Sequence, residues 1–264
     1  MGFGSFILLE NIHFTVNHQE IFVILGGSGC GKSTLLKHII GLHRPLAGEI
    51  LIQGQPMNPQ DQESYQHILQ SFGVMYQGGA LLGSMTLAEN VALPIEAYTD
   101  LPKQAVRDLA CIKLQQVGLM GFENHLPMEV SGGMNKRAAI ARALALDPAI
   151  LFLDEPSAGL DPITSAELDN LILEINQIQG TTVVVVSHEL PSIFAIAHRA
   201  IMLDKQTRSI IANGDPGWLR DHSEHPFVHD FFNRKPSVPH PSETISAHNS
   251  MNPNDLGHGH GTAP

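Results

Sequence analysis

The sequence has few cysteines and few basic residues. Its 264 residues include two cysteines, Cys30 and Cys111, which lie far apart and in no metal-ligand spacing. We therefore expect neither a disulfide framework nor a zinc site, and a reducing compartment fits the chain. Fifteen lysines and arginines stand against 26 acidic residues, for a formal net charge of −11. This balance argues against a nucleic-acid partner, which needs a basic face to neutralise phosphates.

Long apolar runs are also missing. The strongest run, residues 181–186, has the length of a buried strand, whereas a spanning helix needs about 20 apolar residues. We expect a chain that does not cross a membrane by itself, and residues 1–6 lack the layout of an export signal. With 43% apolar residues, the chain can bury a full core, which favours one large domain or a domain with a lobe.

Strand-like segments alternate with helical ones along much of the chain. This alternation predicts an α/β fold with a largely parallel sheet. Two apolar runs, 150–153 and 182–186, have no polar alternate, which is typical of central strands covered on both faces. The predicted strands are 21–25, 49–52, 73–76, 150–153 and 182–187, and the predicted helices include 33–40, 102–117 and 132–146.

The segment between about residues 61 and 146 is mostly helical in pattern, with Thr86 and Glu89 spaced as a capping box. We predict a helical lobe at about 78–146, inserted into a domain that covers 1–234. Residues 235–264 are rich in Pro, Ser, Asn, His and Gly, which predicts a disordered tail. Its four histidines fit either a metal-binding segment or a solvated tail.

Residues 26–33, GGSGCGKS, match the pattern GxxxxGK[ST] between a predicted strand and a predicted helix. In that context, main-chain N–H groups and the helix N-terminus bind phosphates. Lys32 would bridge the β- and γ-phosphates, and Ser33 would offer its hydroxyl to Mg²⁺. A glycine-rich turn with an incidental lysine is the alternative. The predicted nucleotide-binding residues here are Gly26, Gly27, Ser28, Gly29, Cys30, Gly31, Lys32, Ser33 and Thr34.

Two carboxylates, Asp154 and Glu155, end the apolar run 150–153. A buried acidic pair at the end of a strand requires nearby positive charge, which a nucleotide-bound Mg²⁺ supplies. Asp154 would hold the metal through water, and Glu155 would orient or deprotonate the attacking water. Taken alone, such a pair is also a common polar cap on a strand. The phosphate-binding pattern upstream favours the catalytic interpretation.

Residues 130–135, VSGGMN, resemble the LSGGQ signature of the ATP-binding-cassette (ABC) ATPases, and the resemblance covers about residues 3–232. It implies a P-loop NTPase (RecA-like) core with an inserted helical signature lobe and a small antiparallel β region. It also implies that Ser131, Gly132 and Gly133 bind the γ-phosphate of ATP held by an opposite subunit, and hence a homodimer. Met134 replaces the usual glutamine, which leaves no expectation for a side-chain contact there.

Further motifs follow in the order of that family. Gln77 matches the glutamine that reaches Mg²⁺ and the attacking water, so it counts as both catalytic and metal-binding. Asp161 in SAGLD matches the loop that touches the other subunit, and His188 matches the histidine that contacts the γ-phosphate. A histidine after a strand is otherwise most often a surface or capping residue. Phe3 stands where the family places an aromatic on adenine, although an additional strand normally precedes it.

Within that family the chain resembles the ATPases of the Mla or MCE-associated lipid transporters, through QGGALLGSM at 77–85, VALPIEAYTDL, SGGMNKRAAIARALALDP and PFVHDFF. This narrower resemblance implies a transmembrane permease dimer, an MCE-domain protein, in some systems a STAS-domain regulator, and phospholipid cargo. It places the chain at the cytoplasmic face of a bacterial inner membrane, held through the permease. Segment 77–85 is alternatively a helix-capping loop with apolar side chains beneath it; exposure of Leu81, Leu82 and Met85 would favour a permease dock.

The expected mechanism is closure of two copies on two ATP·Mg²⁺, hydrolysis through Glu155 and His188, and reopening that drives the permease. Two rival classes fit the sequence less well. A soluble ABC ATPase acting on ribosomes or DNA usually carries two cassettes or a coiled-coil insertion, and this chain shows one cassette and no heptad run. A P-loop kinase for a small substrate does not account for VSGGMN or SAGLD.

Overall fold

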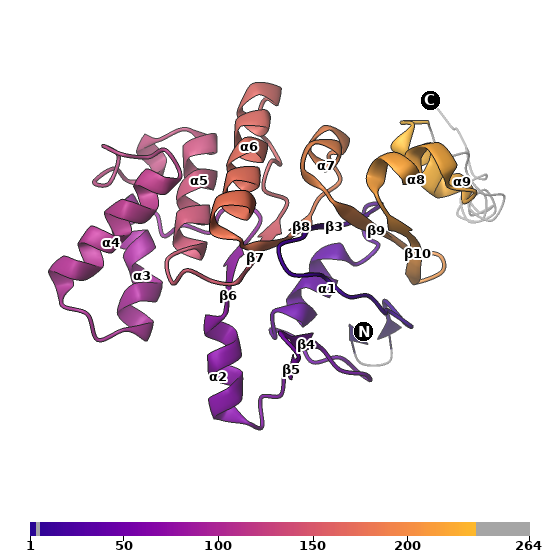
Figure 1. Cartoon of the computed structure of the whole chain (residues 1–264), viewed down its shortest axis with the longest axis horizontal. Helices are drawn as coiled ribbons and strands as arrows, with labels where there is room; N and C mark the ends of the chain where they lie inside the picture. The colour runs from indigo at the N-terminus through magenta and orange to yellow at the C-terminus, as the bar shows by residue number, and fades with distance from the viewer. Residues whose placement is uncertain (4–5, 236–264) are drawn as a thin grey trace, which may run out of the picture.

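The computed structural model describes residues 1–3 and 6–235. Its centre is a six-stranded sheet in the order β10-β9-β3-β8-β7-β6, parallel except for β10 (Figure 1). Two short antiparallel pairs, β1 with β2 and β4 with β5, lie outside it. The predicted α/β class, with a parallel core and a small antiparallel region, is confirmed. The strands are β1 (Gly2–Phe3), β2 (Phe6–Ile7), β3 (Ile21–Gly26), β4 (Leu51–Ile52), β5 (Gln55–Pro56), β6 (Phe72–Met75), β7 (Ile150–Asp154), β8 (Thr182–Val186), β9 (Arg199–Asp204) and β10 (Ser209–Gly214).

Helices cover both faces of the sheet, with α1 on one side and α6 and α7 on the other (Figure 1). Successive side chains of a strand point to opposite faces, so the central strands contribute to two cores. In β7, for example, Leu151 and Leu153 join the core beneath α6, whereas Phe152 joins the core with α1. The helices are α1 (Lys32–Ile39), α2 (Gln62–Gln70), α3 (Leu87–Tyr98), α4 (Lys103–Gln116), the 3₁₀ turn η1 (Pro127–Glu129), α5 (Gly132–Ala143), α6 (Pro162–Gln179), α7 (Leu190–Ile196), α8 (Pro216–His222) and α9 (Pro226–Phe232).

Helices α3, α4 and α5 pack together at one end of the molecule, within the range 78–146 proposed for the lobe (Figure 1). Two predicted elements differ. The predicted strand 49–52 is reduced to Leu51–Ile52 and pairs with β5 instead of joining the parallel sheet. The predicted helix 132–146 ends at Ala143, because Pro148 follows closely and Asp147 adopts a left-handed backbone with φ of 49°.

Within the described residues, no helix combines the length and apolar character required to cross a bilayer. The tail predicted to be disordered, including its four histidines, lies outside the described residues apart from Lys235.

Candidate active site

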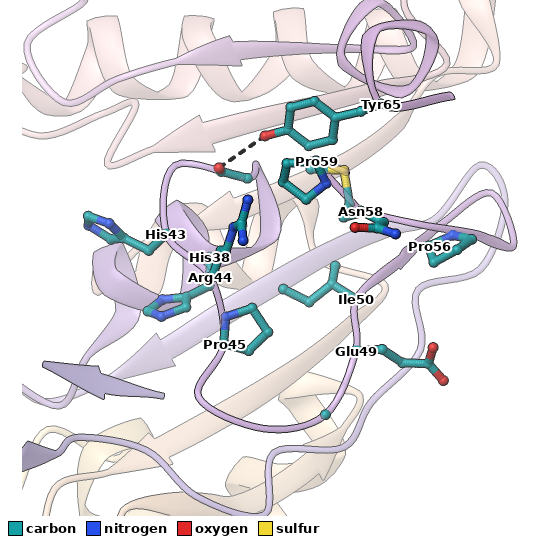
Figure 2. Close-up of a pocket in the computed structure, with 13 residues that line it drawn as sticks. His38, His43, Arg44, Pro45, Glu49, Ile50, Pro56, Asn58, Pro59 and Tyr65 are labelled. Carbon is teal, nitrogen blue, oxygen red and sulfur yellow. Dashed lines mark hydrogen bonds between the residues drawn. The ribbon is translucent and has the colours of Figure 1, made fainter. Parts of the chain in front are cut away.

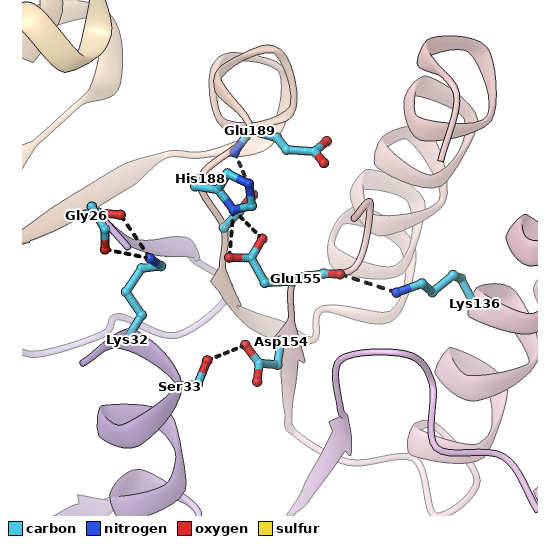
Figure 3. Close-up of polar contacts among 10 residues, drawn as sticks. Gly26, Lys32, Ser33, Lys136, Asp154, Glu155, His188 and Glu189 are labelled. Atoms are coloured by element: carbon cyan, nitrogen blue, oxygen red, sulfur yellow. Dashed lines mark hydrogen bonds and ion pairs between the residues drawn. The ribbon is translucent and has the colours of Figure 1, made fainter. Parts of the chain in front are cut away.

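The residues that the sequence predicts to bind or hydrolyse nucleotide lie together at one edge of the sheet. The phosphate loop, residues 26–33, follows β3; Asp154 ends β7 and Glu155 follows it; His188 lies two residues beyond β8. Strands β3, β8 and β7 are parallel neighbours, so their carboxyl ends share one edge, where α/β sheets place their ligands. Figure 3 shows Lys32, Ser33, the two carboxylates and His188 together at this edge.

The start of α1 is arranged to hold an anion. Gly31 is its N-cap with φ of 104°, a conformation that side chains rarely adopt, and no side chain caps the helix. The first turn also carries no acidic residue, so the helix N-terminus keeps its positive character. The Lys32 ammonium lies over the same loop and donates to the carbonyl oxygens of Gly26 at 2.9 Å and Gly27 at 3.2 Å. A phosphate group fits this combination of donors.

The side chain of Cys30, a residue of the phosphate loop, belongs to the core. Its side chain is 1% exposed and packs among the residues of the α1 core. Burial raises the pKa of the Cys30 thiol, so the reactive thiolate is disfavoured. The geometry favours the interpretation as a small residue tolerated in the loop over that of a redox switch. Ser28 and Gly29, by contrast, are exposed.

Ser33 and Asp154 bring two hard oxygen donors together. The Ser33 hydroxyl donates to Asp154 Oδ1 at 3.2 Å. Burial raises the pKa of Asp154, and the hydrogen bond from Ser33 offsets part of that effect. A buried carboxylate of this kind is stabilised by a cation, and hydroxyl and carboxylate oxygens are ligands that Mg²⁺ prefers. The pair therefore fits the predicted magnesium site.

Glu155 and His188 form a direct pair beside that site. His188 Nδ1 lies 2.8 Å from Glu155 Oε1 and 2.9 Å from Oε2, and the Glu155 side chain is nearly buried while that of His188 is largely exposed. The Glu155 main chain is left-handed, with φ of 50°, and its N–H donates to the Val186 carbonyl at 2.9 Å. A non-glycine residue held in this region is strained, and such strain concentrates at functional sites.

Lys136 of α5 is a neighbour of the carboxylates that the sequence analysis did not select. It is 7% exposed, and its ammonium donates to the main-chain carbonyl of Glu155 at 3.4 Å (Figure 3). Desolvation lowers the pKa of Lys136, and the nearby charges of Glu155, Asp154 and Glu189 oppose that shift. The available signal was its spacing, four residues after Gly132, which puts it on the same helical face.

The signature residues sit at the start of α5, where Ser131 is the N-cap and accepts from the Met134 N–H at 3.2 Å. A Cβ on Gly133 would lie 2.4 Å from Thr164 Cγ2, so a glycine is required by packing as well. Asp161 caps α6, accepting from the N–H groups of Ile163 and Thr164. Among the contacts described, these residues bond within their own helix starts and not to the carboxylate pair.

Gln77 lies just after the edge strand β6 and is exposed. The loop that follows it is fixed by two side chains of the lobe. Arg142 donates to the carbonyls of Gly79 and Ala80, both at 2.8 Å. Asn90, which is fully buried, donates to the carbonyls of Leu82, Met85 and Thr86 and accepts from the Leu82 N–H.

Apolar side chains of this loop divide between surface and interior. Leu82 is 47% exposed, whereas Leu81 and Met85 are half-buried and Leu81 packs against the main core. The exposed Leu82 thus fits the interpretation as a permease dock, and the half-buried Leu81 and Met85 fit the interpretation as a helix-capping loop. Phe3 lies in β1, and its side chain is not among those that the structure describes.

A separate hollow lies at the far end of α1, between that helix, β5 and Tyr65 of α2 (Figure 2). Tyr65 closes one side by donating its hydroxyl to the Gly41 carbonyl at 3.1 Å. His38 lines it and is 1% exposed. None of the phosphate loop or carboxylate residues contributes to this hollow, so it is not part of the active site.

Comparison with known proteins gives a consistent picture. Residues 9–158 match the family model described as ABC transporter. The chain is 40% identical to the intermembrane phospholipid transport system ATP-binding protein MlaF of Escherichia coli K12, over 81% of this chain and 82% of that protein. It is 44% identical to the probable ribonucleotide transport ATP-binding protein mkl of Mycobacterium leprae over 72% of this chain, but spans only 54% of that relative's length. A solved structure of the ATP-binding cassette MJ0796, dimeric and bound to ADP and Pi, has a TM-score of 0.72 at 32% identity and covers 81% of this chain and 94% of that one.

Proposed function

This chain belongs to the ABC transporter family, as the motif resemblance predicted, and we propose that it is the subunit that binds and hydrolyses ATP to drive phospholipid transport. The Glu155–His188 pair, next to Ser33 and Asp154 at the mouth of the phosphate loop, carries this proposal. It joins an anion cradle, a metal-suited oxygen pair and a proton acceptor at one sheet edge. Each of these is required for hydrolysis of a phosphoanhydride.

In this proposal the phosphate loop and Lys32 hold the phosphates. Ser33, Asp154 and Gln77 would hold Mg²⁺, which would neutralise charge on the phosphate oxygens. Glu155 accepts a hydrogen bond from the attacking water; a carboxylate has about four lone-pair sites, so it can do so while bonded to His188. His188 orients Glu155 and, with its exposed ring, reaches toward the terminal phosphate.

The composite site requires a second copy. Ser131 caps a helix that begins at Gly132, and no hydrogen bond described joins these residues or Gly133 to the chain's own phosphate loop; a helix start attracts an anion. We assign these residues, with Asp161, to the nucleotide of the partner subunit in a homodimer. The dimeric state of the MJ0796 cassette supports this assignment.

A permease dimer would be the membrane partner, with the β6–α3 loop, residues 76–86, and exposed Leu82 as the contact. The MlaF relative, which the chain matches along most of both lengths, favours phospholipid cargo over the ribonucleotide named for the mycobacterial relative, of which the chain spans about half. A place at the inner membrane, an MCE-domain protein and a STAS-domain regulator complete the assembly that this cargo implies.

Substitution Glu155→Gln tests the enzymatic part. The amide keeps the shape of the side chain but is a poor proton acceptor, so we expect ATP binding to persist while turnover falls by roughly 10²-fold or more. Light scattering with saturating ATP and Mg²⁺ should show a dimer that persists. Wild-type turnover in this variant, or a strictly monomeric protein, would refute the proposal.

The cargo is tested on the complex. Detergent-extracted membranes containing the tagged chain should yield a permease with bound phospholipid, identified by mass spectrometry. Co-purification with ribosomes, or a permease that carries nucleotide instead of lipid, would overturn the transport assignment.

A further inference from the structure

Lys136 is a buried cation that contacts the main chain of Glu155 and not its carboxylate. Its ammonium hydrogen bonds to the main-chain carbonyl of Glu155, at 3.4 Å, and not to a carboxylate side chain. The carboxylates of Asp154, Glu155 and Glu189 lie near enough to stabilise its charge. Burying an ammonium is costly unless it is compensated, so a lysine here requires a reason beyond packing.

The conformation of Glu155 supplies that reason. Its φ of 50° places the main chain in the left-handed region, which a non-glycine residue occupies only when its surroundings hold it there. Two hydrogen bonds hold it from opposite sides. Its N–H donates to Val186 of β8, and its carbonyl accepts from Lys136 of α5. The sheet and the signature helix thus share control of this residue's backbone.

The same face of α5 contacts the chain beyond Glu155. Lys136 lies four residues after Gly132 and three residues after Gly133, so all three lie on one side of the helix. A Cβ on Gly132 would lie 3.8 Å from Leu160, and one on Gly133 would lie 2.4 Å from Thr164. One helical face therefore packs along residues 155–164, from the catalytic carboxylate to the start of α6.

We propose that Lys136 is a positioning residue that couples the start of α5 to the Glu155 backbone of the same chain. The inference rests on the proposed function, in which the α5 start binds the partner's nucleotide. Occupancy of the partner's site would then fix α5, and through Lys136 it would fix Glu155 in its own site. Each nucleotide thereby prepares the carboxylate that acts on the other.

Hydrogen–deuterium exchange of the nucleotide-free full chain tests the contact independently of hydrolysis. The variant Lys136→Met keeps the length of the side chain and removes the charge and the donors, so exchange in the peptide 155–164 should rise. Lys136→Arg keeps the positive charge and the hydrogen-bond donors and should restore protection from exchange. Lys113→Met is the matched control, because Lys113 is also a buried lysine of the lobe but pairs with Asp147.

Turnover supplies the second readout. In Lys136→Met we expect kcat to fall about ten-fold with ATP affinity and melting temperature close to wild type, since a charge-assisted hydrogen bond is worth that order. Lys136→Arg should recover most of the loss. Protection and turnover in Lys136→Met equal to those of Lys113→Met would overturn the proposal, as would an equal loss of ATP binding and turnover.

A double-mutant cycle tests the coupling itself. Ser131→Ala removes the N-cap acceptor at the α5 start, and residues that act as a unit give non-additive effects. The loss in Ser131→Ala/Lys136→Met should therefore be smaller than the product of the single losses, whereas Ser131→Ala/Lys113→Met should be multiplicative. A multiplicative result for both pairs would refute coupling. Normal turnover in Glu155→Gln would instead refute the proposed function and leave the exchange result standing.

Discussion

The edge of the sheet that carries the candidate active site and the helical lobe hold their functional groups in different ways. At the sheet edge, Asp154 and Glu155 are carried by a buried central strand whose neighbours fix its main chain on both sides. In the lobe, the loop after Gln77 follows an edge strand and is fixed by side chains, chiefly Asn90 and Arg142. Main-chain pairing between strands thus positions the carboxylates, and a few individual side chains position the adjoining loop.

This difference has a consequence for mutational sensitivity. Substituting a carboxylate at the sheet edge changes the chemistry while the strand ladder keeps the fold. Substituting a clamping side chain in the lobe leaves several main-chain groups of the loop without their hydrogen-bond partner, which costs stability. Substitutions at the sheet edge should therefore lower activity without loss of stability, and substitutions of the clamping side chains in the lobe should lower stability without loss of activity.

The largest expected effect is at the sheet edge. Asp154→Asn keeps the side-chain shape but removes the charge, so Mg²⁺-dependent ATP turnover should fall by roughly 10²-fold or more. Because burial raises the pKa of Asp154, its ionised form costs stability, and the free energy of unfolding should stay equal or rise by about 1 kcal/mol. ATP turnover and urea unfolding measure the two. A loss of more than about 2 kcal/mol in the free energy of unfolding would contradict the claim that the sheet edge affects activity and not stability.

The next effect is in the lobe. Asn90→Ala should lower the free energy of unfolding by about 2–3 kcal/mol, since Asn90 is fully buried and makes four hydrogen bonds to residues 82–86. Turnover of the folded protein should remain within about two-fold of wild type, because the hydrogen bonds of Asn90 go to residues 82–86 and not to the phosphate loop or the carboxylate pair. Thermal melts and steady-state turnover measure both, with exposed Asn124→Ala as the control. A loss of turnover without a loss of stability would contradict this separation.

The smallest effect lies where the two regions meet. Gly133→Ala forces a Cβ against Thr164 Cγ2, and we expect a loss of about 1–2 kcal/mol. Thr164→Ser removes that methyl group and keeps the hydroxyl that donates to Asp161 at 2.5 Å, so the double variant should recover the melting temperature. Its turnover should stay low if Gly133 also faces a phosphate. Recovery of both would assign this glycine to packing alone.

The sequence predicted the catalytic edge better than the lobe, for a physical reason. The phosphate loop and the Asp154–Glu155 pair follow central strands, and parallel strands bring their carboxyl ends together whatever the details of packing. The capping box of Thr86 and Glu89 was likewise a local signal, and the structure forms it.

Interactions that depend on tertiary packing were not predicted. The contact of Lys136 with Glu155 and the clamp of Arg142 on Gly79 join residues 19 and 63 positions apart. The left-handed backbone of Glu155 also has no local sequence signal. The capping role of Asp161 does have one, since Pro162 follows it at the first helical position, whereas the family resemblance implies for Asp161 only a contact with the partner subunit.

Strand β6 occupies the outer edge of the six-stranded sheet and hydrogen bonds to a single strand, β7. It ends at Met75, two residues before Gln77. A strand bonded along one side has fewer main-chain partners than a central strand, so fewer hydrogen bonds hold it in place. Gln77 therefore follows a parallel strand that is paired on one side only, whereas Asp154 ends, and Glu155 follows, a strand that is paired on both sides.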